Sequence, residues 1–130
     1  PAEVYHRPAH PFVAGFIGAA NTLPCQMHTW AADHAHITLP GVETPIRAGH
    51  ALAQPPRSPL LVVRPEHIRL DTAGWIDGTV LRRQFLGDAH EITIDSAHGV
   101  LRARLAIGDA PSPGTRVGLS WEDGWLIEAG

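Results

Sequence analysis

Two histidines separated by one residue form the pattern in this sequence that most resembles a metal site. His34 and His36 lie in an alternating segment, and side chains two apart on a strand share a face, so an ion could in principle be held between them. No third or fourth ligand stands at a characteristic spacing. We therefore expect both on the outward face of a strand and assign no metal-ligating residue. The other histidines are interpreted as surface or hydrogen-bonded core residues: His6, His10, His28, His50, His67, His90 and His98.

The segment Arg64-Pro65-Glu66-His67 combines residue types found in catalytic sites. No nucleophile or oxyanion-hole pattern accompanies it, so a catalytic role is the weaker interpretation. In the structural interpretation, Pro65 ends a strand and opens a tight turn, while Arg64 and Glu66 find charge-assisted partners. We favour the structural interpretation and assign no catalytic and no cofactor-binding residue.

Cys25 is the single cysteine of the chain. It excludes an internal disulfide framework and a cysteine-rich zinc site, and it suits a reducing compartment. A reactive thiolate needs a cationic neighbour, and the flanking Pro24 and Gln26 supply none. The sequence therefore predicts a small buried or half-buried side chain.

Four arginines on two predicted strands could form a patch for an anion. Alternation places Arg102 and Arg104 on one outward face, whereas Arg82 and Arg83 point in opposite directions. Because charged strand faces are commonly just solvated, we favour the solvated interpretation and leave the anion patch open.

The composition argues against a nucleic-acid partner. The formal net charge is −3 and the sequence pI about 6.3, so the cationic footprint that meets phosphates is absent. Single-strand sites also stack bases on exposed aromatic side chains, yet aromatic residues make up only 6% of the chain and Trp121 falls in the core register. The sequence therefore predicts no nucleic-acid binding.

Length and residue usage fix the class of protein further. The 130 residues, 44% of them hydrophobic, suffice for about one globular domain. The ten cationic residues are all arginine, so a phosphate-binding P-loop, which needs a lysine, is excluded. No apolar run approaches the roughly 20 residues of a membrane span. The sequence begins with Pro1, and we expect it to be a piece of a longer protein.

The predicted secondary structure that positions these residues changes from helix to strand after about residue 20. Pro11 suits a first helical position, and an apolar stripe follows at helical spacing, which predicts a short helix that acts as a connector over residues 1–20. From Asn21 onward the period is that of strands. The segment His34–Leu39 alternates, Leu60–Val63 is a buried strand, and Ile68 and Leu70 resume the alternation.

The last third of the chain has the clearest strand pattern. Strands are predicted from Thr79 to Leu86 and from His90 to Asp95, with Ile92 and Ile94 inward. Further on, Val117, Leu119 and Trp121 share a face, and residues 122–124 are expected to make a hairpin into residues 125–127. Short strands separated by turns at this spacing indicate an all-β fold. We expect a small antiparallel barrel of the oligomer-binding (OB) type with part of a second barrel.

A set of short motifs extends along the whole chain. They are Pro1-x-Glu3-Val4-Tyr5-x-x-Pro8, Phe12-Val13-Ala14-x-Phe16-Ile17-Gly18, Asn21-x-Leu23-Pro24, Val63-Arg64-Pro65-Glu66-His67-Ile68, Gly78-Thr79-Val80, Phe85-Leu86-Gly87 and Gly114-x-x-Val117-x-Leu119-Ser120-Trp121. In this order and at this spacing, the motifs resemble the ATP-binding subunits of ABC importers at the junction with their C-terminal accessory domain. Asn21 and the segment Arg64–His67 form the structural signature of that family here.

The resemblance implies the transport-associated OB (TOBE) domain of an importer in the maltose, spermidine/putrescine and ferric-iron group. It implies residues 1–20 as a connector from an absent ATPase domain, 21–57 as a first β segment and 58–130 as the TOBE segment. It further implies a non-catalytic regulatory and dimerisation role and a homodimer. The parent ATP-binding subunit, of which this chain would be a part, would contact the membrane subunits of the transporter at the inner, cytoplasmic face of the cell membrane. ATP and Mg would bind in the absent domain. The alternative is a module that senses an oxyanion or another small solute.

Overall fold

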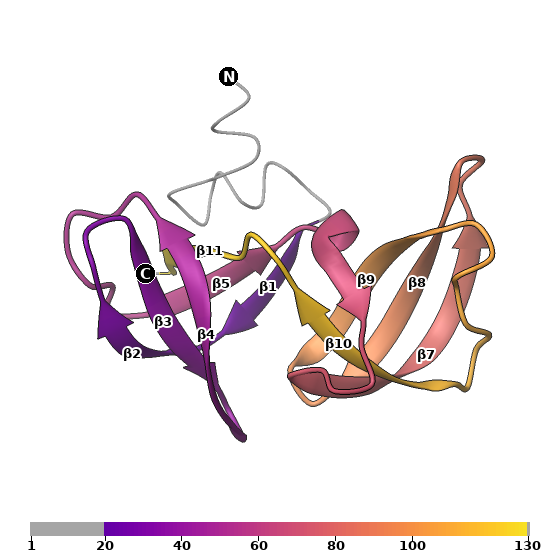
Figure 1. Ribbon diagram of the computed structural model, residues 1–130, viewed down its shortest axis with the longest axis horizontal. Helices are drawn as coiled ribbons and strands as arrows, with labels where there is room; N and C mark the ends of the chain where they lie inside the picture. Colours follow the sequence, from indigo (N-terminus) through magenta and orange to yellow (C-terminus); the bar gives the residue numbers. More distant parts are fainter. Residues whose placement is uncertain (1–19, 130) are drawn as a thin grey trace. The chain divides into compact units, whose positions relative to one another are not determined.

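The structure is a computed structural model of the 130-residue chain, and it describes residues 20–129. The helix predicted over residues 1–20 lies almost wholly outside the described residues. The all-β prediction is confirmed, because strands account for nearly all regular structure (Figure 1). In chain order the elements are β1 (Asn21–Pro24), β2 (Gln26–Trp30), β3 (His34–Leu39), β4 (Val42–His50), β5 (Pro59–Val63), the 3-10 helix η1 (Pro65–His67), β6 (Ile68–Leu70), β7 (Ile76–Phe85), β8 (Ala89–Ser96), β9 (Gly99–Ala106), β10 (Arg116–Trp121) and β11 (Trp125–Glu128).

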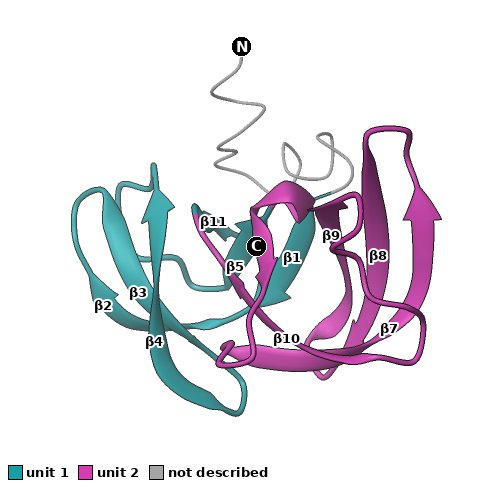
Figure 2. Cartoon of the chain, turned by 45° about the vertical axis from the view of Figure 1, so that its right-hand side comes forward, with its two compact units in different colours: residues 1–63, 123–130 teal, residues 64–122 magenta. Residues whose placement is uncertain are grey.

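The chain forms two compact units, shown in different colours in Figure 2. Unit 1 comprises residues 1–63 and 123–130, and unit 2 comprises residues 64–122. The chain therefore leaves unit 1 after Val63 and re-enters it at Asp123, so that unit 2 is an uninterrupted segment and unit 1 is not. Each unit has its own sheet.

The sheet of unit 1 has the strand order β1-β5-β11-β4-β3-β2. Its β3 follows the predicted alternation, with Ala35, Ile37 and Leu39 buried and the residues between them half-buried. The sheet is antiparallel except where β11 runs parallel to β4.

The predicted hairpin across residues 122–124 is wrong. Although Asp123 adopts a positive φ of 57° and the chain turns there, β11 does not pair with β10. Trp125 instead pairs with Val62 of β5 and with Gly49 of β4. The reason is burial: Leu126 and Ile127 are consecutive and both 0% exposed, so both faces of β11 need cover, which an interior position in the unit 1 sheet provides.

Unit 2 holds a five-stranded sheet with the order β6-β10-β7-β8-β9. Its first and last strands, β6 and β9, contact each other, which closes the sheet into a small barrel. As predicted, Ile92 and Ile94 of β8 point inward, where they lie opposite Ala103 and Leu101 of β9. The antiparallel OB-type architecture is therefore confirmed.

One loop of unit 2 approaches β10 so closely that only glycine fits. The loop from Asp71 to Trp75 is tied to β10 by hydrogen bonds from Asp71 N–H to Gly118 O and from Trp75 N–H to Leu119 O, both 2.9 Å. A Cβ atom on Gly118 would collide with the Asp71 carbonyl oxygen, and one on Gly74 would collide with the backbone of Leu119. The two glycines therefore fix how this end of the barrel is covered.

Candidate functional site

The segment Arg64–His67 forms a tight turn in unit 2, as the structural interpretation of this motif predicts. Pro65 occupies the first position of η1, where its missing N–H is not needed. The turn closes with a hydrogen bond from His67 N–H to Arg64 O at 3.0 Å, and Ile68 N–H returns to Pro65 O. Arg64 Nε donates to Glu66 Oε2 at 3.1 Å, so the two charged residues are each other's charge-assisted partner.

The environment of Glu66 fits a structural role. Partial burial acts to raise the pKa of Glu66, but its own backbone N–H and the Arg64 guanidinium together hold that pKa below its usual value of 4.5. A carboxylate kept ionised in this way is an ion-pair partner rather than a proton donor near neutral pH. The remaining signature residue, Asn21, lies buried in unit 1 at the start of β1, opposite Val63 of β5.

His34 and His36 share the outward face of β3, as predicted, and each has one ring nitrogen engaged. His34 Nδ1 donates to Asp33 Oδ1 at 2.8 Å, and His36 Nδ1 lies 3.0 Å from Thr29 Oγ1. The two imidazoles meet edge to face with ring centroids 5.9 Å apart. No group of three or more His, Cys, Asp or Glu side chains that could hold a metal ion occurs within residues 20–129.

His50 is a core histidine. It is 4% exposed, and its ring stacks on Trp30 at a centroid distance of 4.0 Å. Nε2 donates to Ala31 O at 2.8 Å, while Nδ1 accepts a hydrogen bond from Leu52 N–H at 3.1 Å. These two bonds require the neutral tautomer with its proton on Nε2, so both ring nitrogens are engaged in hydrogen bonds to the backbone.

Cys25 is buried, as predicted. Desolvation raises the pKa of its thiol from the ordinary 9.0 to about 12. A thiol with such a pKa is almost fully protonated near neutral pH. Burial therefore makes Cys25 a poor nucleophile near neutral pH, and the side chain packs in the core of unit 1.

Arg82 and Arg83 lie in neighbouring rows and face opposite ways, as predicted, and Arg82 reaches its row through a register shift between Val80 and Arg82. Arg82 lies opposite Thr93, which lies opposite Arg102, so these three residues form one row across β7, β8 and β9. Arg83 belongs to the neighbouring row, faces the other way and donates to Ala110 O at 3.1 Å. Arg104 lies 3.9 Å from Glu91. The row places two arginines on either side of a threonine on an outward face.

Exposed apolar side chains at the end of the β7–β8 hairpin are a feature that the sequence analysis missed. Phe85 is 61% exposed, Ile107 is 54% exposed, and Leu86 is exposed as well. Phe85 and Leu86 directly precede the hairpin turn, and Ile107 follows Ala106, which pairs with Ala89 just after the same turn. We call these three residues the hairpin-end cluster. The sequence does carry a signal for this cluster, because Phe85 and Leu86 directly precede the predicted turn at Gly87, where side chains are commonly exposed.

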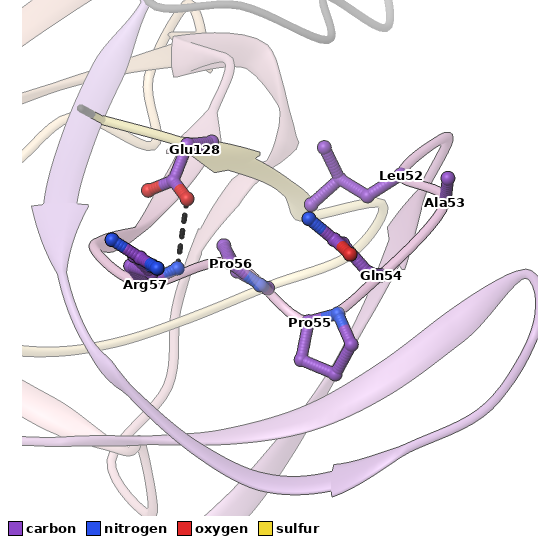
Figure 3. A pocket seen from close by; sticks show the side chains of 7 residues that line it. All are labelled: Leu52, Ala53, Gln54, Pro55, Pro56, Arg57 and Glu128. Carbon is purple, nitrogen blue, oxygen red and sulfur yellow. Dashed lines mark hydrogen bonds between the residues drawn. The ribbon is translucent and has the colours of Figure 1, made fainter.

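A hollow lies at the proline-containing loop between β4 and β5 of unit 1 (Figure 3). Its volume is about 550 Å³, and it is lined by Leu52, Ala53, Gln54, Pro55, Pro56, Arg57 and Glu128. The Glu128 carboxylate accepts hydrogen bonds from the backbone N–H groups of Arg57 and Ser58, both at 2.7 Å. Its two oxygens thereby hold the loop against β11, so this carboxylate is already engaged.

A comparison with protein-family models gives the decisive match. Residues 61–127, more than half of the chain, match the model described as "TOBE domain". The chain belongs to the TOBE domain family. The matched segment of the TOBE domain begins in β5, contains all of unit 2 and ends in β11, so it includes the return of the chain to unit 1. TOBE domains are accessory domains of ABC ATPases.

Curated relatives of this TOBE domain chain are ATP-binding subunits of importers. The Fe(3+) ions import ATP-binding protein FbpC of Brucella suis is 34% identical over 103 residues, which cover 78% of this chain and 28% of that protein. The spermidine/putrescine import ATP-binding protein PotA of Methylococcus capsulatus is 33% identical over 138 residues, which cover 98% of this chain and 36% of that protein. The chain thus spans only about a third of the length of these relatives.

A solved structure confirms the fold of the TOBE domain chain. The cytoplasmic molybdate-binding protein ModG, in a crystal form with molybdate bound, superposes with a TM-score of 0.60 over 85% of this chain and 96% of that chain. The sequence identity is 16%, so the likeness shows a shared fold. Within the described residues, no helix is long and apolar enough to cross a membrane.

Proposed function

We propose that this chain is the non-catalytic regulatory and dimerisation domain of the ATP-binding subunit of an ABC-type solute importer. The observation that carries the proposal is the alignment with importer ATP-binding subunits over 78% to 98% of the chain, together with the TOBE match. The chemistry of the described residues agrees, because the Arg64–Glu66 pair, His50 and Cys25 are all engaged in holding the fold.

In this proposal the domain acts mechanically. Two copies form a lasting contact while the ATPase domains of the parent subunits open and close between cycles. The hairpin-end cluster supports the pairing part, since exposed apolar side chains grouped at one place on a sheet suit an interface better than they suit water. ATP and Mg bind in the ATPase domain of the parent, which also contacts the membrane subunits at the inner face of the membrane.

Sedimentation equilibrium over a range of concentrations tests the proposal, on this chain and on the longer subunit that carries it. We expect reversible pairing, weakened by Phe85→Ser at the hairpin end. Val100→Ser serves as the matched control, because Val100 is equally exposed but lies near the start of β9, at the opposite end of that strand. Absence of pairing in both proteins contradicts the dimerisation role, and ATP turnover by the chain alone contradicts the non-catalytic role.

A second candidate is an oxyanion-sensing module, favoured by the row of Arg82, Thr93 and Arg102. Two guanidinium groups beside a hydroxyl are a donor set that suits an oxyanion. ModG provides a precedent for molybdate on this fold. Calorimetry against molybdate, phosphate, a polyamine and a sugar distinguishes the candidates: heat with an oxyanion that is lost in Arg102→Gln supports sensing, and no heat with any of them removes it.

A further inference from the structure

The outward face of β3 holds two imidazoles in an arrangement that the dimerisation role does not use. His34 and His36 are both half-buried, which restricts their rings more than full exposure would. Each ring is fixed through Nδ1, one by the Asp33 carboxylate at 2.8 Å and one by the Thr29 hydroxyl at 3.0 Å. In both rings, these Nδ1 contacts are the only hydrogen bonds found within residues 20–129, so both Nε2 atoms have no protein partner there.

The Nδ1 partners determine which nitrogen carries the lone pair. A carboxylate accepts, so the neutral ring of His34 carries its proton on Nδ1 and presents a lone pair at Nε2. The Thr29 hydroxyl can accept from His36 Nδ1 as readily as donate to it, because the hydroxyl rotates, so His36 can take the same tautomer. Histidines that bind metals in proteins are held in this way, with the second ring nitrogen bonded to a carboxylate or another oxygen.

We infer that His34 and His36 form a two-histidine site for a divalent transition-metal ion, bound through the two Nε2 atoms. Imidazole nitrogen suits copper, nickel and zinc, and Cu²⁺ binds such a site most tightly of the three. The ring centroids lie 5.9 Å apart, a spacing at which one ion can be shared once the rings turn both Nε2 atoms toward it, with each metal–nitrogen bond roughly 2.0–2.1 Å long. Because residues 20–129 offer no group of three ligating side chains, water completes the coordination.

Two charged neighbours set the strength of the site in opposite directions. The Asp33 carboxylate orients His34 and brings a negative charge beside it. Arg47 lies opposite His36 on β4 and brings a positive charge to the same face. The inference therefore predicts that removing Arg47 tightens cation binding and that removing the charge of Asp33 weakens it, a pair of signs that non-specific binding to scattered histidines does not produce.

Titration calorimetry with CuCl₂ tests the site, with His6 and His10 both changed to Gln so that imidazoles outside the described residues do not compete. We expect one Cu²⁺ per chain in this background. The double variant H34Q/H36Q should lose that binding, and Asp33→Asn should weaken it about tenfold. Arg47→Gln should tighten it. His98→Gln is the matched control, since His98 follows β8 in unit 2, and it should leave the affinity unchanged.

A spectroscopic readout separates ligation from loss of structure. In ¹³C-edited NMR, substoichiometric Zn²⁺ should shift the imidazole resonances of His34 and His36 and leave those of His98 in place, while far-UV circular dichroism shows that each variant is folded. Binding of Cu²⁺ by H34Q/H36Q with the affinity of its background overturns the inference. So does a Zn²⁺-induced shift that falls on other histidines. The site does not depend on the proposed dimerisation role, so either can fail alone.

Discussion

Replacing Gly118 by alanine perturbs a single close contact in unit 2. The added Cβ would lie well under 3.0 Å from the Asp71 carbonyl oxygen, and the obstacle is backbone, which cannot rotate away. Forcing the loop outward costs roughly 1–3 kcal/mol of overpacking. It also loosens the hydrogen bonds from Asp71 N–H to Gly118 O and from Trp75 N–H to Leu119 O, each worth about 1 kcal/mol. We expect the free energy of unfolding to fall by about 3–5 kcal/mol.

The matched control is Gly108→Ala. Gly108 has a φ of +96° and nothing within 4 Å of the position of a Cβ, so this change tests backbone strain without a collision. Its expected cost is about 1–2 kcal/mol. Urea unfolding followed by the fluorescence of Trp75 and Trp121, whose rings meet edge to face at 4.9 Å in unit 2, reports the difference. A cost for Gly118→Ala no larger than that for Gly108→Ala refutes the steric argument.

Three further predictions concern side chains whose partners are defined. Because burial raises the pKa of Cys25 from 9.0 to about 12, its contribution to stability is complete below pH 9 and is lost as the pH rises toward 12; Cys25→Ala should flatten the fall in melting temperature across that window. The pKa of Glu66 is lowered, so its contribution is present above pH 4.5 and is lost as the pH falls through the folded-state pKa; Glu66→Gln should flatten the acid limb of a stability profile. Glu128→Gln leaves one oxygen for two N–H groups and should lower the free energy of unfolding by about 1–3 kcal/mol. Amide hydrogen exchange at Arg57 and Ser58 should become faster; unchanged exchange would show that the Glu128 carboxylate does not hold the loop.

Local patterns in the sequence predicted the strands whose two faces differ. In β3 the alternation of Ala35, Ile37 and Leu39 with polar residues gave both the bounds and the buried face, because one side of this strand meets the core and the other meets water. The turn at Pro65 was also predictable, since a proline restricts its own backbone and can donate no hydrogen bond to a ladder.

Pairings between distant segments were not predictable in the same way. Nothing local to Trp125–Glu128 says that this strand enters the unit 1 sheet between β4 and β5, and a turn at Asp123 is compatible with either outcome. The orienting partners of the two outward histidines show the same limit. Asp33 is adjacent to His34 in sequence, but Thr29 reaches His36 only through the register of β2 and β3, which includes a bulge.

The return of β11 into unit 1 sets an order of events during synthesis. Residues 64–122 are contiguous, so the barrel of unit 2 can close as soon as they have left the ribosome. The sheet of unit 1 is completed later, because β11, which lies between β4 and β5, is the last of its strands to be translated. A nascent chain stalled just before Trp125 would therefore carry a complete barrel in unit 2 and a sheet in unit 1 that lacks the strand between β4 and β5.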